Sequence, residues 1–288
     1  MKIIITGGNG FIGKNLIKYL KFYKYEIYSL SIDFNKENSK KAIEKIFKEF
    51  NPNYVIHLAG LAHNKDRDLL KTPNKIKNIN TKYPVFLANI CKYSNVKKFV
   101  YISTIGVHGE GSKNKLVNEN TEYQPYNLYT ISKMNAEKNI IKNLENSKTK
   151  YTVLRPSLVI GKNAPGNIAS IKKLIKFRIP LPINGFNNKR NIIYVNDLCN
   201  LIHRCLINKK ANNQIFVASG SKPLTILETF QEVAKIENLK LKSFLIPKEL
   251  IFIFFYLIGK KNIINKFSLN LLIDSSKAKD LLDWNSQI

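Results

Sequence analysis

The sequence predicts an α/β fold, in which helices wind around both faces of a parallel sheet and a smaller, irregular lobe follows toward the C-terminus. Apolar runs of strand length alternate with amphipathic runs of helix length over residues 1–155, which is typical of β–α–β units. Beyond Arg155, proline and glycine residues crowd between shorter elements and break this alternation. The chain has 288 residues, 44% of them hydrophobic, which is enough for a substantial core.

The individual elements follow from the hydrophobic pattern in chain order. Residues 2–6 form a short apolar strand before a glycine cluster, and residues 14–22 are amphipathic at helical spacing. The same reasoning predicts further strands at 26–32, 54–59, 98–103 and 151–154, and further helices at 39–50, 80–93 and 126–144.

Composition and charge exclude several classes of protein. The net charge of +27 comes from lysines spread along the whole chain, so we interpret it as solvated surface and expect no nucleic-acid partner; a field that attracts an anionic small substrate is the alternative. Cys91, Cys199 and Cys205 are too few and too scattered for a disulfide framework or a metal site, which favours a reducing, cytoplasmic location. The most apolar run, residues 250–258, is far shorter than the roughly 20 residues of a membrane span, so we expect no integral membrane segment.

The glycine cluster predicts a dinucleotide site. Gly7, Gly10 and Gly13 lie between the first strand and the first helix, where a tight turn lets a pyrophosphate approach the backbone and the helix N-terminus. Such a site gives a Rossmann-type, doubly wound sheet. We therefore assign residues 1–155 to a dinucleotide-binding domain and residues 156–288 to a mainly substrate-binding lobe, packed closely against it and returning some segments to it.

An acidic residue after the second strand is expected to bind the ribose hydroxyls of the dinucleotide. Asp33 lies 20 residues after Gly13, close to the expected separation, and Ser31 competes for this role. No arginine follows the strand to hold a 2′-phosphate, which favours NAD, although Lys36 leaves NADP open.

A Y-x-x-x-K pattern on the helix at 126–144 is the strongest candidate for catalysis. The spacing places Tyr129 and Lys133 on one face, where the ammonium favours the phenolate and lowers the tyrosine pKa, as a general acid/base requires. With 14 tyrosines in the chain the pattern also arises by chance, and it gains weight from the glycine loop and from Thr104 upstream.

Taken together, these motifs resemble those of the extended short-chain dehydrogenase/reductases, in the NAD-dependent epimerase/dehydratase group that acts on nucleotide sugars. The likeness covers nearly the whole chain. The matching residues are T-G-G-N-G-F-I-G at 6–13, H-L-A-G at 57–60, Asn80, F-V-Y-I-S-T at 99–104, V-H-G-E at 107–110, Tyr129 with Lys133, L-R-P at 154–156, Arg190, and D-S-S-K-A at 274–278 with L-L-D-W at 281–284.

The resemblance implies a role for each matching residue. Thr104 would hydrogen-bond the sugar O4, Tyr129 would shuttle its proton, and Lys133 would hold the nicotinamide ribose. Arg190 and Asn167 would contact the substrate diphosphate, and Leu271 would line the pocket beside a 2-acetamido group. The residues that would contact the cofactor are Gly7, Gly10, Phe11, Ile12, Gly13, Asp33, Phe34, Leu58, Ala59, Gly60, Asn80, Tyr129, Lys133, Arg155 and Pro156.

The chain also departs from the family pattern. The segment between the second strand and residue 54 is too short for the family's extra strand, so Asp33 and Phe34 would contact both ribose and adenine. His108 replaces the usual tyrosine. Residues 250–258 resemble the family's buried C-terminal helix, with contact to a membrane surface as the alternative.

The resemblance favours a 4-epimerase for UDP-glucose or UDP-N-acetylhexosamines in surface-polysaccharide synthesis. The alternative is an NAD(P)H-dependent reductase of UDP-4-keto-sugars, and a non-catalytic dinucleotide-binding protein is a third reading. Dehydration is disfavoured because Ile105 and Gly106, which follow Thr104, carry no acid. The only partner we expect is the UDP-sugar; a homodimer is left open.

Overall fold

A six-stranded parallel sheet forms the centre of the computed structural model, which describes residues 1–61, 73–112, 115–257, 259 and 269–287. The strand order is β2-β1-β3-β4-β5-β8, and every neighbouring pair is parallel. The predicted α/β class is therefore confirmed. The strands are β1 (Lys2–Thr6), β2 (Glu26–Leu30), β3 (Tyr54–His57), β4 (Lys98–Ile102), β5 (Lys150–Pro156) and β8 (Gln214–Ala218).

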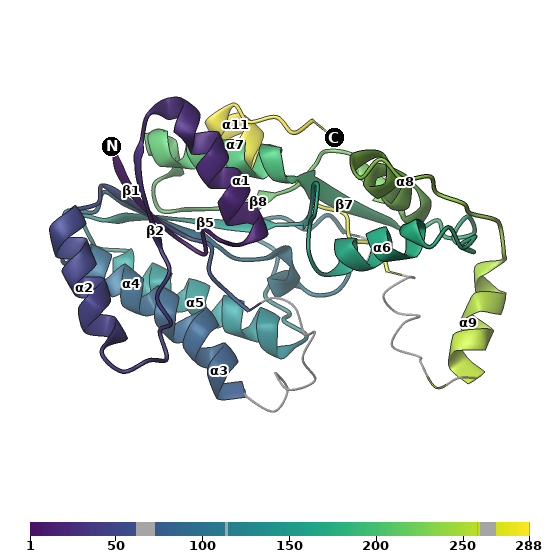
Figure 1. Ribbon diagram of the computed structural model, residues 1–288, viewed down its shortest axis with the longest axis horizontal. Coiled ribbons are helices and arrows are strands. Elements are labelled where there is room, and N and C mark those ends of the chain that lie inside the picture. Colours follow the sequence, from purple (N-terminus) through teal and green to yellow (C-terminus); the bar gives the residue numbers. More distant parts are fainter. Residues whose placement is uncertain (62–72, 113–114, 258, 260–268, 288) are drawn as a thin grey trace.

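Helices cover both faces of the sheet (Figure 1). Helices α1 (Phe11–Leu20) and α7 (Val195–Ile207) pack with one core cluster, and α2 (Ser39–Phe50), α4 (Tyr83–Lys92) and α5 (Leu128–Leu144) pack with the other. The central strand β4 is buried at all five positions, as expected for a parallel strand covered on both sides.

Most predicted elements occur close to their predicted bounds, and the differences arise at the ends of strands and helices. The predicted helix 39–50 coincides with α2, whereas α1 begins at Phe11 instead of residue 14 because Gly10 caps the helix with extended backbone. The predicted helix 80–93 is continuous with an earlier turn: α3 (Pro73–Lys77) passes through a π-helical turn, η2 (Asn78–Lys82), into α4.

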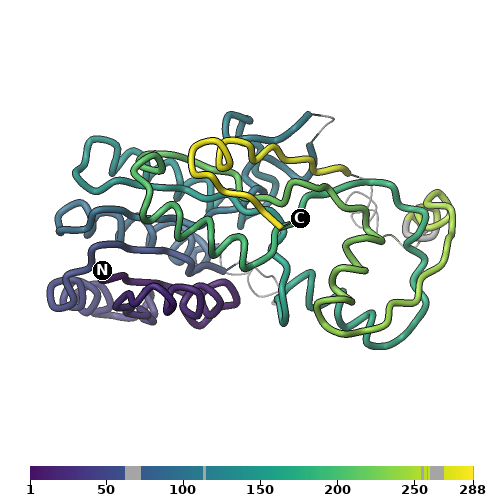
Figure 2. The backbone as a smooth tube through the Cα atoms, turned by 90° about the horizontal axis from the view of Figure 1, so that it is seen from above, coloured from purple at the N-terminus to yellow at the C-terminus, as the bar shows by residue number. Residues whose placement is uncertain are grey.

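The C-terminal half supplies both a small lobe and parts of the main sheet. The lobe contains a second sheet of β6 (Leu158–Ile160), β7 (Lys189–Tyr194) and β9 (Pro223–Thr225), with α6 (Asn167–Lys176) and α8 (Ile226–Ile236) packed on its own core. In contrast, β8 pairs with β5, and α7 and α11 (Ser276–Leu282) lie over the main sheet. Figure 2 shows the two halves from above. The division at residue 155 stays a prediction.

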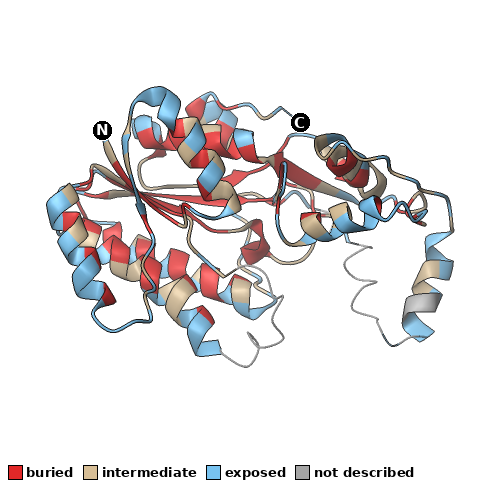
Figure 3. Ribbon diagram, in the orientation of Figure 1, coloured by how far each residue is buried: buried red, intermediate tan, exposed pale blue. Residues whose placement is uncertain are grey.

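The expectation of a buried helix at residues 250–258 was wrong. Helix α9 (Lys248–Leu257) covers this run except Ile258, which lies outside the described residues. Among the described side chains of α9, Ile251 and Phe252 pack on the lobe core, and the helix extends past that core. Leu250, Ile253, Tyr256 and Leu257 are exposed, and Figure 3 shows exposed surface on this helix.

Candidate active site

The glycine loop turns the chain sharply from β1 into α1. Gly7 has a φ of +71°, in the left-handed region that favours glycine, and the Gly10 N–H donates to its carbonyl at 3.0 Å. A Cβ at Gly13 would lie 2.2 Å from that same carbonyl oxygen, so the loop and helix pack without room for a side chain. At Gly10, by contrast, the only described atom that a Cβ would meet is the Gly7 oxygen, at 3.2 Å. Nothing else in the part of the chain that the structure describes covers Gly10 at this distance.

This open surface suits a bound pyrophosphate. Gly10 is the N-cap of α1, and no side chain caps the helix, so the first-turn N–H groups remain available to an anion. Phe11 and Ile12 follow, half-buried, and Phe11 packs against both the main core and the lobe core. The chain thus offers what a dinucleotide requires at its phosphates.

The residues after β3 lie directly against the glycine loop. A Cβ on Gly7 would be 2.7 Å from the Ala59 nitrogen, and the Leu58 N–H donates to the Thr6 carbonyl at 3.2 Å. A Cβ at Gly60 would lie 3.4 Å from Lys133 Nζ, an ordinary contact distance. Leu58, Ala59 and Gly60 therefore connect the glycine loop to Lys133.

Asn80 is fully buried and holds this region to α5. Its Oδ1 accepts from the Leu61 N–H at 2.8 Å, and its Nδ2 donates to the Leu61 carbonyl at 3.2 Å and to Ser132 Oγ at 3.1 Å. All three bonds are internal to the protein. The structure thus gives Asn80 a positioning role, and its predicted contact with a cofactor stays a prediction.

Asp33 and Phe34 follow β2 in the chain, just past the carboxyl end of that strand. Asp33 is exposed and accepts from the Asn35 backbone and side chain at 3.0 and 3.2 Å, and these bonds lower the pKa of its carboxyl group. Phe34 is half-buried because its ring stacks on Tyr83 at 4.8 Å. An exposed carboxylate beside a fixed ring suits the predicted contacts with ribose and adenine.

Thr104, Tyr129 and Lys133 come together at the carboxyl end of β4. Thr104 caps a short 3₁₀ turn, η3 (Ile105–His108), and its Oγ1 accepts from the Gly106 N–H at 3.2 Å while also hydrogen-bonding the phenol of Tyr129. Lys133 is 3% exposed, and its Nζ donates to the Ile102 carbonyl at 2.8 Å. The structure therefore assembles the predicted catalytic residues from separate elements.

Burial dominates the electrostatics of this site. It raises the pKa of Tyr129 to about 12, against which the Thr104 hydrogen bond acts, and Tyr126 raises it further. Burial also lowers the pKa of Lys133 to about 8, opposed by the Glu137 carboxylate. The lowering of the Tyr129 pKa that the sequence predicts from Lys133 is not among these causes; the Lys133 ammonium instead donates to the Ile102 carbonyl.

Arg155 turns into the protein. Its Nε and Nη2 donate to Glu137 Oε2 at 3.0 and 2.7 Å, its Nη2 to the Tyr123 hydroxyl at 2.6 Å, and its Nη1 to His108 Nε2 at 2.9 Å. Both charged side chains are essentially inaccessible. The Arg155 side chain thus fixes α5 and η3 to β5. Pro156 is buried at the end of β5, and its contact with a cofactor stays a prediction.

Arg190 and Leu271 are neighbours, whereas Asn167 lies on another element. Arg190 and Leu271 form a β-bridge, and the Arg190 guanidinium donates to the Leu269 and Glu110 carbonyls at 3.2 and 2.9 Å. Leu271 is only 8% exposed, so little of it is available to line a pocket. Asn167 is exposed at the start of α6.

Tyr126 lies near both the turn capped by Thr104 and Arg190, and the sequence motifs did not predict this. A Cβ on Gly106 would be 3.7 Å from its ring, and its hydroxyl pKa is raised by burial and by Glu110 and lowered by Arg190. Its position three residues before Tyr129, just ahead of the helix cap Asn127, was the available signal.

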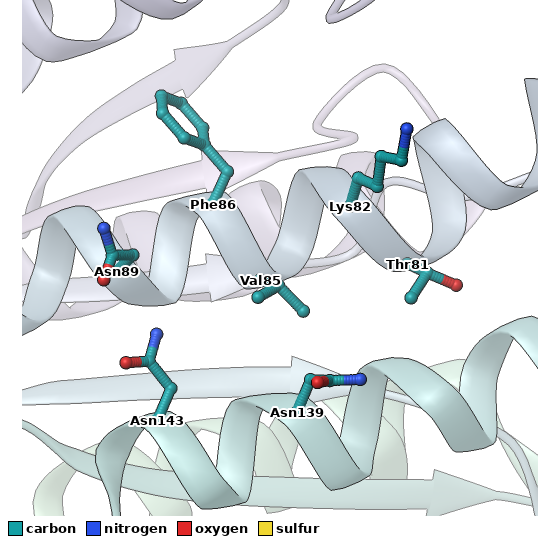
Figure 4. Close-up of a pocket in the computed structure, with 7 residues that line it drawn as sticks. All are labelled: Thr81, Lys82, Val85, Phe86, Asn89, Asn139 and Asn143. Carbon is teal, nitrogen blue, oxygen red and sulfur yellow. The ribbon is translucent and has the colours of Figure 1, made fainter.

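A separate hollow of about 420 Å³ lies between α4 and α5 (Figure 4). Val85 points toward α5, and Phe86 points away from it. None of Thr104, Tyr129 and Lys133 lines it. The remaining lining residues are Thr81, Lys82, Asn89, Asn139 and Asn143.

Comparisons with known proteins agree on one group. The model of the NAD dependent epimerase/dehydratase family matches residues 3–218. UDP-glucose 4-epimerase of Vibrio cholerae is 30% identical over 299 aligned positions, which cover 98% of this chain and 90% of that protein. GDP-6-deoxy-D-talose 4-dehydrogenase of Aggregatibacter actinomycetemcomitans is 26% identical, covering 82% of this chain and 80% of its own. The structure of Thermus thermophilus UDP-glucose 4-epimerase in complex with NAD has a TM-score of 0.77 at 20% identity, covering 100% of this chain and 94% of that one.

Proposed function

The chain belongs to the NAD-dependent epimerase/dehydratase family, and from this premise we propose that it is a 4-epimerase of UDP-sugars. The family resemblance stated from the motifs is thereby confirmed, and the protein is an NAD(P)-dependent enzyme. The observation that carries the proposal is the assembly of Thr104, Tyr129 and Lys133 beside an open glycine loop. UDP-glucose and UDP-N-acetylhexosamines are the proposed substrates, in surface-polysaccharide synthesis.

The glycine loop and the residues after β3 would hold the dinucleotide. Gly10 and the N-terminus of α1 would receive its phosphates, and Gly60 lies close to Lys133, where the nicotinamide end belongs. The chemistry that NAD supplies when bound is reversible hydride transfer at C4 of the sugar. The exposed Asp33 carboxylate would accept hydrogen bonds from the ribose hydroxyls, which supports NAD over NADP.

Tyr129 is the residue that we propose moves the O4 proton. Its hydroxyl is held by Thr104, which would also hydrogen-bond O4 and so fix the sugar next to the phenol. With a pKa of about 12, almost none of Tyr129 is phenolate near neutrality, so removal of the O4 proton requires positive charge that stabilises the phenolate. Lys133 supplies an ammonium from the next turn of the same helix, held by the Ile102 carbonyl.

Arg190 is the proposed contact for the substrate diphosphate. A guanidinium has five N–H donors in a planar fork that suits phosphate oxygens. Two carbonyls orient it, and Tyr126 lies between it and Thr104. A substrate with its diphosphate at Arg190 would therefore extend past Tyr126 toward the catalytic residues.

A 4-keto-sugar reductase is the second candidate, because a 4-dehydrogenase is among the similar proteins. The same residues serve both reactions, since each needs hydride and proton transfer at C4. A 4,6-dehydratase is not proposed, because buried Ile105 and Gly106 offer no acid beside Thr104.

The test is incubation with UDP-glucose and UDP-N-acetylglucosamine, with and without NADPH, followed by NMR. Formation of the C4 epimer without added reductant supports the epimerase, whereas turnover of a 4-keto sugar only with NADPH supports the reductase. Tyr129→Phe should abolish either activity, and Tyr93→Phe, at a position 77% exposed, is the matched control. Full activity of Tyr129→Phe would contradict both proposals.

A further inference from the structure

Large apolar side chains are exposed on two neighbouring segments of the C-terminal lobe. Phe177 and Ile179, after α6, are 62% and 57% exposed, and Leu245, before α9, is 70% exposed. The two segments run side by side, because the Phe244 N–H donates to the Leu181 carbonyl at 3.0 Å. Exposed apolar side chains gathered on neighbouring segments mark an interaction site.

Helix α9 extends this surface. Ile251 and Phe252 pack on the lobe core, with the Phe252 ring 5.9 Å from that of Phe186. The described apolar side chains on the opposite side of the helix are exposed. Its outer stripe, at spacings of three and four residues, consists of Leu250, Ile253 and Leu257, which are 58%, 55% and 77% exposed.

The polar residues around this surface are almost all basic. Residues 170–185 and 240–257 together contain seven lysines and arginines but one acidic residue, Glu249. Lys172 Nζ forms an ion pair with Glu237 Oε2 at 2.7 Å. The other basic side chains are exposed: Lys173, Lys176, Arg178, Lys240, Lys242 and Lys248.

We propose that this lobe docks on an anionic lipid bilayer, with the outer stripe of α9 and the side chains of Phe177, Ile179 and Leu245 inserted at its surface. Apolar side chains ringed by lysines match the two forces that hold a helix at such an interface, apolar burial and attraction to anionic headgroups. Among helices of the described residues, none is long and apolar enough to cross a membrane, so α9 would lie in the interface plane.

A second copy of the chain fits this surface less well than lipid does. A two-fold interface places the same patch on both sides, so the basic residues of one copy would face those of the other. Anionic headgroups instead neutralise this charge. The proposal uses none of the catalytic residues and stands independently of the reaction.

The test is co-sedimentation of the full chain with vesicles. We expect binding to vesicles of phosphatidylglycerol and phosphatidylethanolamine, loss of binding at high salt, and little binding to phosphatidylcholine alone. The triple variant Leu250→Ser, Ile253→Ser, Leu257→Ser should bind at least about tenfold more weakly. Phe22→Ser, at a position 81% exposed on η1 (Lys21–Tyr23), is the control and should bind like the wild type.

A second readout covers the case in which the triple variant misfolds. An environment-sensitive dye on Ile253→Cys should change its emission on adding anionic vesicles, whereas the dye on Phe22→Cys should not. Equal binding by the folded triple variant, equal binding to neutral vesicles, or an unresponsive dye at residue 253 would overturn the proposal. So would a wild-type oligomer, measured by light scattering, that the triple variant converts to monomer.

Discussion

Two glycines of the loop offer a matched pair of substitutions that separates cofactor binding from folding. At Gly10 the φ of −75° suits alanine, and the added Cβ would meet only the Gly7 oxygen at 3.2 Å. We expect the free energy of unfolding of Gly10→Ala to lie within about 1 kcal/mol of the wild-type value, because a small steric cost is offset by the lower entropy of the unfolded chain. At Gly13 the Cβ would lie 2.2 Å from the same oxygen and 2.6 Å from the Gly8 Cα, which forces the backbone apart. Gly13→Ala should therefore lose about 1–3 kcal/mol or more of stability.

For cofactor affinity, the direct effect should instead come from Gly10→Ala. In Gly10→Ala the methyl group occupies the open surface where a pyrophosphate would approach, so NAD affinity should fall at least about tenfold, or about 1.4 kcal/mol, in a folded protein. Urea unfolding gives the stability and titration calorimetry gives the affinity. Unchanged NAD affinity in Gly10→Ala would refute the assignment of the glycine loop, and a Gly13→Ala protein as stable as Gly10→Ala would refute the packing argument.

Three further outcomes test the site. Tyr129→Phe should lower kcat by at least about 100-fold while UDP-sugar affinity, measured by calorimetry, changes little; a kcat within tenfold of the wild type would remove Tyr129 as the acid/base. Burial lowers the pKa of Lys133 to about 8, so the buried ammonium destabilises the folded protein below pH 8. This destabilisation decreases as the pH rises toward 10.5, the pKa of Lys133 in the unfolded chain. The stability gained by Lys133→Met, relative to the wild type in the cofactor-free protein, should thus be larger at pH 7 than at pH 10 in urea unfolding, and a pH-independent difference would contradict the shift. Arg155→Leu leaves the Glu137 carboxylate buried without its partner and should cost about 3–5 kcal/mol, part of which Arg155→Leu with Glu137→Leu recovers; strictly additive losses would contradict the pairing.

The parts of the structure that sequence could predict are those set by local pattern. The alternation of apolar and amphipathic runs gave the strands of the N-terminal half, and α2 matches its predicted bounds because its burial repeats at Ser39, Ile43 and Phe47. Thr104, Tyr129 and Lys133 could be selected because a shared family motif fixes their spacing. Their meeting at the end of β4 follows from the parallel sheet.

The remaining features depend on contacts between distant segments. Arg155 was expected to line the cofactor, yet its side chain is drawn inward by the Glu137 carboxylate, and no spacing reveals that pairing. The influence of Arg190 on Tyr126 depends on β7, which is remote from Tyr126 in the sequence. The exposure of α9 was missed because an apolar run looks the same in sequence whether one side of the helix is covered or both.

The pairing of β8 with β5 affects how the chain can fold. During synthesis β5 emerges with one edge unpaired, and that edge stays open until β6, α6, β7 and α7 have been made and β8 arrives. An apolar strand with free backbone donors and acceptors is a template for pairing with other chains. The nascent protein therefore carries this open edge between the emergence of residue 156 and that of residue 218, and a fragment ending at the predicted domain boundary would keep the exposed edge permanently.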